Sequence, residues 1–246
     1  MNGIDMTASA LQPEILEELR RLDTCLVANA IETFQVRLRN EGFTDGSLRC
    51  FFPQLPPLLG HAVTVKIRCS SPPTDGRGYL DRTDWWNHIL TIPVPRVVVL
   101  QDMDPRPGLG SLLGEVHASI LAALHCIGAV TNGSVRDLPA VERMGFHFFA
   151  GQAAVSHAYA HIVEIGGPVE IAGLKIKPGD LLHGDAHGVL SVPVEIAAKI
   201  PAAAAKITEQ ERKLIALCRS PEFSLDKLRA AVGRSQPGVR ARRSTA

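Results

Sequence analysis

The residues best suited to catalysis or ligand binding follow two hydrophobic runs of the sequence. One run, 96–100, is followed by glycines and then by Gly-Glu-Val-His at 114–117, which opens a segment with helical spacing. The other run, 127–131, leads to Arg136 and Asp137. Free N–H groups at a helix N-terminus favour an anion, arginine binds a carboxylate or phosphate, and aspartate binds a hard cation. Together they predict a site for a small, metal-chelating organic acid.

Other interpretations of these residues are open. Asp137 precedes a predicted helix over 138–144 and could be its N-cap, and an adjacent Arg-Asp pair is also common as a surface ion pair. The glycines Gly108, Gly110 and Gly114 follow a strand, as in a dinucleotide-binding turn. Their spacing misses GxGxxG by one residue, and no acidic strand end follows about 20 residues later. A nucleotide site is therefore disfavoured.

The histidines and cysteines give weaker indications of a metal or catalytic site. His157 and His161 would share one face if their segment were helical, and His183 and His187 are expected in a turn. No HExxH motif includes them, so zinc binding is disfavoured and their roles are left open. Cysteines are odd in number and form no CxxC pair, which predicts reduced thiols. We expect a cytoplasmic protein without a secretory signal or membrane span.

The strands and helices that must position the site can be predicted from the periodicity of hydrophobic residues. Alternation and β-branched runs predict strands over 60–67, 96–100, 127–131, 146–150, 162–165, 169–171, 174–176 and 188–192. Helical spacing predicts helices over 13–21, from a cap at Asp23 or Thr24 through Ile31, from Ser111 or Leu112 to Cys126, over 138–144 and over 194–218. Residues 133–134, Gly-Ser, are expected as a turn, and residues 70–84 as a loop.

The composition indicates one globular α/β unit. The chain has 246 residues, of which 46% are hydrophobic and 21% charged. A net charge of +1 argues against broad nucleic-acid binding. We expect a single compact domain over 1–218 and a C-terminal helical extension over 219–246, with the basic stretch 234–243 disordered.

The motifs resemble a known family. Gly114-Glu115 and the run Gly133-Ser134-Val135-Arg136-Asp137 are similar to the family of 4-hydroxy-4-methyl-2-oxoglutarate aldolases and the regulator of ribonuclease activity A, here called RraA-like. Further matching segments are Gly60-x-Ala62-x-Thr64-Val65, Gly145-Phe146, Pro178-Gly179-Asp180-Leu181 and Gly184-Asp185-x-x-Gly188-Val189. The resemblance implies a swivelling β/β/α fold in homotrimers or homohexamers with sites at subunit interfaces.

The resemblance also implies roles for individual residues. The backbone of residues 114–117 (Gly114, Glu115, Val116, His117) and the Arg136 side chain would hold the carboxylate of a pyruvyl group. Asp137 would bind Mg²⁺ or Mn²⁺, with Glu115 near the water ligands. Glu211, or alternatively Glu209, would reach the site of the neighbouring subunit.

The implied activity is that of a divalent-metal-dependent lyase. It would cleave a 4-hydroxy-2-oxo acid to pyruvate and a carbonyl product, and would also decarboxylate oxaloacetate. The alternative is a non-catalytic protein that binds and inhibits a ribonuclease, but such regulators generally lack the aspartate after the arginine, and this chain has Asp137. Ala140 and Asn29 depart from the aldolase pattern, which has acidic residues there, so the natural substrate, the metal and the choice of trimer or hexamer are left open.

Overall fold

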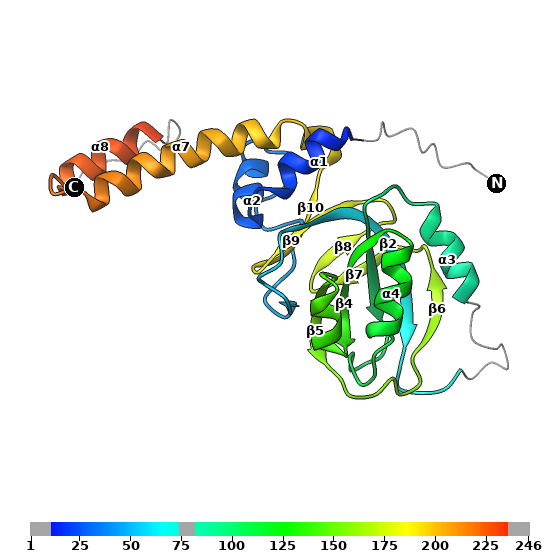
Figure 1. Cartoon of the computed structure of the whole chain (residues 1–246). Coiled ribbons are helices and arrows are strands. Elements are labelled where there is room, and N and C mark those ends of the chain that lie inside the picture. Colours follow the sequence, from blue (N-terminus) through cyan, green and yellow to red (C-terminus); the bar gives the residue numbers. More distant parts are fainter. Residues whose placement is uncertain (1–10, 74–81, 236–246) are drawn as a thin grey trace, which may run out of the picture.

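A mixed eight-stranded sheet forms the centre of the protein (Figure 1). The computed structural model describes residues 11–73 and 82–235. The strand order is β1-β5-β4-β3-β2-β9-β10, and β6 also pairs with β2. The sheet strands are β1 (Arg49–Cys50), β2 (Leu58–Arg68), β3 (Arg96–Asp102), β4 (Cys126–Val135), β5 (His147–Ala153), β6 (His161–Ile165), β9 (Leu181–Asp185) and β10 (Gly188–Val192). A separate hairpin joins β7 (Val169–Ile171) to β8 (Leu174–Ile176).

Strands β2, β3, β4 and β5 run parallel and carry the site at their end. Helices and the β7–β8 hairpin cover the two faces of this sheet, which explains the nearly continuous apolar run of β3, from Val97 to Leu100. The eleven-residue strand β2 pairs with β9 along its first part and with β6 along its last part. The sheet therefore curls into a barrel-like shape.

Eight helices are present in the described residues. They are α1 (Pro13–Arg20), α2 (Thr24–Glu32), α3 (Arg82–Leu90), α4 (Glu115–Ala123), α5 (Leu138–Arg143), α6 (Val194–Ala197), α7 (Ile200–Arg219) and α8 (Leu225–Ser235). Trp85 of α3, Leu121 of α4 and Val141 of α5 belong to one core with the sheet. A second core lies under β7 and β8, and a third joins α1, α2 and α7 to β9 and β10. None of the described helices is long and apolar enough to cross a membrane.

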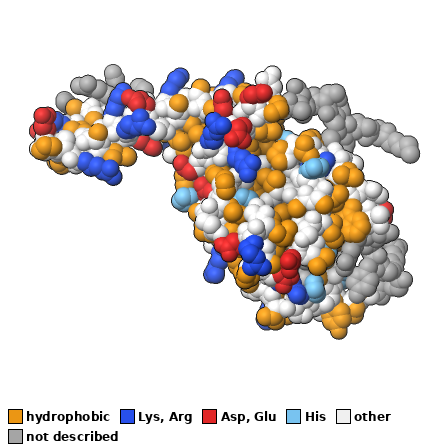
Figure 2. Space-filling view, viewed as in Figure 1, with side chains coloured by type: hydrophobic (Ala, Val, Ile, Leu, Met, Phe, Trp, Pro, Cys, Tyr) orange, Lys and Arg blue, Asp and Glu red, His pale blue; other side chains and the backbone are white. Residues whose placement is uncertain are grey.

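The two C-terminal helices form an arm that extends away from the body (Figure 1). The first part of α7 packs on α2, but Ala204 is the last buried residue among the described side chains. Figure 2 shows basic and acidic side chains interspersed along the visible face of this arm. The expected disorder at 234–243 lies largely outside the described residues, and the predicted boundary at residue 218 stays a prediction.

Several sequence expectations about elements are wrong. The long helix over 194–218 is two helices, because α6 ends before Lys199 and Pro201 occupies the first turn of α7. The C-terminal helical extension expected after residue 218 contains α8, whose residue range was not predicted from the sequence. Helix α3 begins at Arg82, inside the segment expected as a loop. His183 lies in β9 rather than in a turn, and only His187 lies in the turn before β10.

Candidate functional site

A short extended segment brings Gly114 to the end of β4. Leu113 forms a parallel bridge with Val135, and the Arg136 N–H donates to the Leu113 carbonyl over 3.0 Å. The Ser111 hydroxyl donates to the carbonyl of Ser134 over 2.7 Å. Residues 111–113 therefore run beside the last residues of β4, which they join through a single β-bridge at Leu113. This pairing places the start of α4 next to Arg136.

The pairing also corrects two sequence expectations. The helix predicted from Ser111 or Leu112 begins only at Glu115, after an extended Gly114 with φ −145° and ψ −167°. The expected Gly-Ser turn at 133–134 is absent, because β4 continues to Val135 with a register shift between Thr131 and Ser134. Tertiary pairing outweighs local helical spacing and turn propensity here.

Asp137 points its carboxylate at the start of α4. Its Oδ2 accepts a hydrogen bond from the Glu115 N–H over 3.1 Å, and Arg136 Nε lies 3.3 Å from Oδ1. The side chain forms no cap on α5, whose N–H groups at Ala140 and Val141 bond to the Asp137 main-chain carbonyl instead. The capping interpretation is therefore wrong for the Asp137 side chain, which joins the neighbouring helix.

The backbone of Asp137 adopts a left-handed conformation, with φ 57° and ψ 34°. Non-glycine residues rarely adopt this region, and such residues cluster at functional sites. In this conformation the carboxylate turns away from α5 and toward α4.

Gly114 is required by the close approach of the two segments. A Cβ atom built on it would lie 2.4 Å from Asp137 Oδ2 and 2.9 Å from Arg136 Cγ. Both distances are shorter than a carbon atom tolerates, so any side chain at position 114 would push the Arg-Asp pair aside. The glycine thus permits the contact between Asp137 and the first N–H of α4.

Electrostatics keep Asp137 ionised at neutral pH. The hydrogen bond from the Glu115 N–H lowers the pKa of the Asp137 carboxyl group below its usual value, and Arg136 lowers it further. The Asp137 side chain is 35% exposed, so its remaining oxygen lone pairs are accessible to a cation. One carboxylate and surrounding water suit Mg²⁺ or Mn²⁺, because Mg²⁺ usually keeps several of its water ligands.

Arg136 makes a second contact that sequence spacing could not reveal. Its Nη1 lies 3.0 Å from Nδ1 of His157, in the connection between β5 and β6. The Arg136 side chain is 25% exposed and lies between Asp137 and His157. His157 and His161 do not share a helical face, because residues 154–160 form an irregular segment and His161 begins β6.

A family model described as RraA-like (Aldolase/RraA) matches residues 24–191, more than half of the chain. This chain belongs to the RraA-like family. The matched range contains Gly114, Glu115, Arg136 and Asp137, while α7 and α8 lie beyond it. The fold expected from the resemblance, an α/β RraA-like domain with a C-terminal helical extension, is confirmed.

Relatives of this RraA-like chain include a putative 4-hydroxy-4-methyl-2-oxoglutarate aldolase of Halalkalibacterium halodurans. It is 31% identical over 84 residues, which are 34% of this chain and 40% of the relative, so the match spans less than half of that aldolase. An uncharacterized protein of Methanocaldococcus jannaschii is 32% identical over 161 residues, which are 64% of this chain and 71% of the relative.

Solved structures of distant relatives share the fold. An uncharacterized Pseudomonas syringae protein has a TM-score of 0.70 and 21% identity, with coverage of 94% of this chain and 99% of that one. A Streptomyces coelicolor protein, described as an unusual member of the RNase ES inhibitor RraA family, has a TM-score of 0.65 and 20% identity, with coverage of 82% and 96%.

The remaining residues expected at the site of this RraA-like protein differ in how accessible their side chains are to a ligand. Glu115 is exposed at the first position of α4, next to Asp137. Val116 is 70% exposed, whereas His117 is buried and can offer little more than its backbone to a ligand. The Glu115 N–H, expected to hold a substrate carboxylate, donates to Asp137 in this structure.

The two candidate glutamates of α7 lie on the arm, away from the body that contains α4 and β4 (Figure 1). Glu209 is paired with Arg212 and Lys213 on the same helix, over 3.9 and 3.1 Å. Glu211 is exposed. Within one chain, therefore, neither glutamate joins Asp137.

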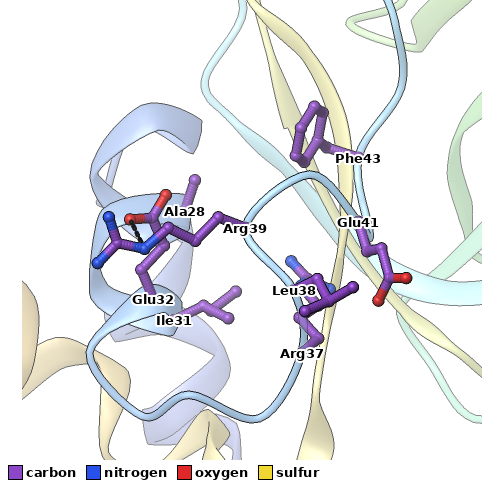
Figure 3. Close-up of a pocket in the computed structure, with 8 residues that line it drawn as sticks. All are labelled: Ala28, Ile31, Glu32, Arg37, Leu38, Arg39, Glu41 and Phe43. Carbon is purple, nitrogen blue, oxygen red and sulfur yellow. Dashed lines mark ion pairs between the residues drawn. The ribbon is translucent and has the colours of Figure 1, made fainter.

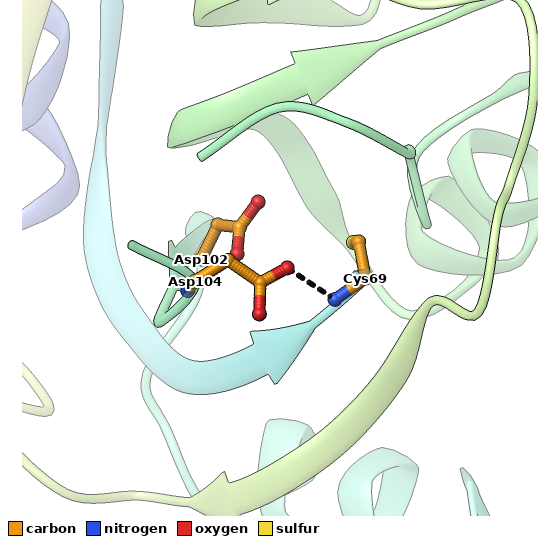
Figure 4. A group of neighbouring side chains, drawn as sticks. All are labelled: Cys69, Asp102 and Asp104. Atoms are coloured by element: carbon orange, nitrogen blue, oxygen red, sulfur yellow. Dashed lines mark hydrogen bonds between the residues drawn. The ribbon is translucent and has the colours of Figure 1, made fainter. Parts of the chain in front are cut away.

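A buried group of metal-ligating atoms lies at the end of β3, formed by Cys69, Asp102 and Asp104 (Figure 4). Their ligand atoms lie within 4.8 Å of one another, close enough to hold a cation. Asp104 Oδ2, however, accepts from the N–H groups of Cys69 and Ser70 over 2.8 and 2.7 Å. Asp102 accepts from the Gly108 N–H over 2.8 Å.

These bonds give the buried group a structural role. Burial raises the pKa of the Cys69 thiol to about 12, so a metal would have to displace the thiol proton as well as backbone hydrogen bonds. Burial also raises the pKa of Asp102, which disfavours its charged form. The two carboxylates hold the turn between β3 and the 111–113 segment, which in turn positions Gly114. The exposed carboxylate of Asp137 is the better candidate for a metal that meets substrate.

A hollow between α2 and the segment 37–43 is unsuited to substrate (Figure 3). Its cavity volume is about 20 Å³, room for about one water molecule. Glu32 and Arg39 form an ion pair over 3.4 Å beside it, and Leu38 and Phe43 line it.

Proposed function

We propose that this RraA-like protein is a divalent-metal-dependent lyase. It cleaves a 4-hydroxy-2-oxo acid to pyruvate and a carbonyl product, with oxaloacetate decarboxylation as a related activity. The observation that carries the proposal is the Asp137 carboxylate, kept ionised and exposed beside the Arg136 guanidinium. The similarity of part of the chain to a putative aldolase supports the reaction class.

Arg136 is suited to bind the carboxylate of the substrate. Its Nε lies against Asp137 and its Nη1 against His157, so both hydrogens of Nη2 and one of Nη1 are left for a ligand among the described contacts. One hydrogen of Nη1 and one of Nη2 point in parallel along one edge of the planar guanidinium, and such a pair matches the two oxygens of a carboxylate. A 2-oxo acid bound there would have its ketone close to Asp137, because Asp137 contacts the same guanidinium.

Asp137 would hold the cation, and Glu115 lies next to it. The cation supplies Lewis-acid stabilisation of the negative charge that develops on the ketone oxygen. Glu115 is exposed beside Asp137, where its carboxylate can orient the base that takes the proton from the 4-hydroxyl group as the C–C bond breaks. The same charge develops when oxaloacetate loses carbon dioxide, so both reactions are expected at one site.

Metal dependence tests the proposal directly. Pyruvate release is measured over a panel of 4-hydroxy-2-oxo acids and oxaloacetate, first with EDTA and then with added Mg²⁺ or Mn²⁺. We expect EDTA to abolish pyruvate release and either metal to restore it, because Asp137 offers a hard oxygen ligand. Full activity in EDTA with no metal by elemental analysis would reject the proposal. A protein that only binds a ribonuclease would release no pyruvate from any substrate.

We also propose that the active form is a homotrimer or homohexamer. Arg136, Asp137 and Glu115 provide one side of a site, and no described side chain after Ala204 is fully buried by its own chain. The end of α7 and all of α8 pack little against the rest of their own chain, so a neighbouring copy of the chain would stabilise the arm. The exposed Glu211 could then approach the site of that copy.

Mixed oligomers test the contribution of the arm. The variants Glu211→Ala and Asp137→Asn are each expected to have little activity, whereas co-expressed mixtures should recover part of it. In random one-to-one mixtures, about a quarter of the interfaces pair two intact halves. The same experiment with Glu209→Ala distinguishes the two glutamates. Light scattering that shows a fully active monomer would contradict the oligomer, and lack of recovery would remove Glu211 from the site.

A further inference from the structure

We infer that His157 is a positioning residue that orients Arg136 for carboxylate binding, an inference that rests on the proposed function. The supporting contact is the 3.0 Å separation of Arg136 Nη1 and His157 Nδ1. An arginine side chain can only donate hydrogen bonds, so Nδ1 must be the acceptor. His157 is therefore in its neutral form with the proton on Nε2 when this bond exists.

The two contacts of Arg136 act on opposite sides of its guanidinium group. Nε lies against Asp137 Oδ1 over 3.3 Å, and Nη1 donates to His157. A single contact would leave the guanidinium plane free to rotate, whereas two contacts on opposite sides hold the plane and direct Nη2 outward. Holding a donor group before the ligand arrives lowers the entropy cost of binding.

The backbone around His157 is held by the same segment that positions Gly114. The Ser111 N–H donates to the carbonyl of Ser156 over 3.0 Å, and the Ala158 N–H donates to the Ser156 hydroxyl over 3.0 Å. A Cβ atom on Gly110 would lie 2.3 Å from the His157 carbonyl oxygen, which shows how closely the two segments pack. The imidazole is exposed, but its main chain is anchored next to the site.

Kinetics of three variants test this role. His157→Leu removes the acceptor, whereas His157→Asn places an amide oxygen where Nδ1 stands. We expect His157→Leu to raise KM for the oxo acid roughly tenfold with little change in kcat, since a hydrogen bond from a charged donor is stronger than one between neutral groups. His157→Asn should restore KM to within about threefold of the wild type. The matched control is His187→Leu, which removes another exposed histidine bonded to a charged side chain, Asp185.

Nitrogen NMR of the imidazole provides a readout that does not depend on activity. In ¹⁵N-labelled protein, long-range ¹H–¹⁵N correlations identify which ring nitrogen of His157 carries the proton, and the His157→Asn spectrum assigns the signal. We expect an unprotonated Nδ1 and a protonated Nε2 in the wild type. In Arg136→Ala the two neutral tautomers should become mixed, because the donor that selects one of them is gone.

Each result supports or overturns the inference. A protonated Nδ1 in the wild type, or tautomers unaffected by Arg136→Ala, would show that His157 does not hold the arginine. Equal KM values for His157→Leu and His157→Asn, or a loss confined to kcat, would also overturn it. If the wild type neither releases nor binds pyruvate, the proposed function fails, and the nitrogen spectra alone then decide whether His157 orients Arg136.

Discussion

Replacing Asp137 by asparagine is expected to reduce turnover at least about a hundredfold, since a catalytic cation contributes several kcal/mol of charge stabilisation and about 1.4 kcal/mol is a tenfold change in rate. The amide keeps an oxygen that can accept from the Glu115 N–H, so the local contact can persist. Asparagine also tolerates the left-handed backbone at this position. The substitution therefore removes the negative charge of the side chain and keeps its shape. Steady-state kinetics at saturating Mg²⁺ measure the effect.

The fold should be nearly unaffected by Asp137→Asn. The folded-state pKa of Asp137 is lowered, so its charge adds stability above the pKa of the unfolded state, and this is lost as the pH falls. The group is 35% exposed, so solvent screens the contribution and the melting temperature should fall only slightly. Asp45→Asn is the matched control, since Asp45 is exposed and also accepts from a backbone N–H. A large drop in melting temperature with turnover retained would assign Asp137 a structural role instead.

Replacing Arg136 is expected to weaken binding of the oxo acid. Arg136→Lys keeps the positive charge but has one nitrogen, which cannot contact Asp137, His157 and a carboxylate in the geometry of the planar fork. We expect KM to rise at least about tenfold for Lys and further for Ala, because charged hydrogen bonds are worth about 1.5–3 kcal/mol. Steady-state kinetics with the preferred oxo acid measure the change.

Arg143→Lys serves as the control for Arg136→Lys, since Arg143 is exposed in the last turn of α5. We expect its KM to match that of the wild type. Unchanged kinetics in Arg136→Lys would mean that the carboxylate binds elsewhere.

Most of the central sheet could be predicted from the sequence. Strands buried on both faces need continuous apolar runs, and those runs are local features that can be read residue by residue, as in 96–100 and 127–131. Strand β9 was not predicted, because its residues, Leu-Leu-His-Gly-Asp, mix a buried histidine and a glycine with the leucines. His183 is accommodated there by hydrogen bonds to Thr24 and to the Leu19 carbonyl, which lie far away in the sequence.

The start of α4 depended on tertiary structure. Leu112 and Leu113 have the apolar character of a helical stripe, and both are buried as such a stripe would be. Neither residue is helical, because Leu113 forms a β-bridge with Val135 of β4. Burial alone does not distinguish a helix from an added strand, so local pattern could not give the correct first residue of the helix.

The sequence by itself determined which residues meet: Gly114, Glu115, Arg136 and Asp137 follow adjacent parallel strands, and such strands end at one edge of a sheet. Only the tertiary structure decided how they face one another. The left-handed backbone of Asp137 turns its carboxylate to α4 rather than α5, and the packing of Gly110 against the His157 main chain brings the imidazole to Arg136. Both orientations depend on contacts between segments that are distant in the sequence. The energies of such contacts cannot be predicted from the local pattern of residues.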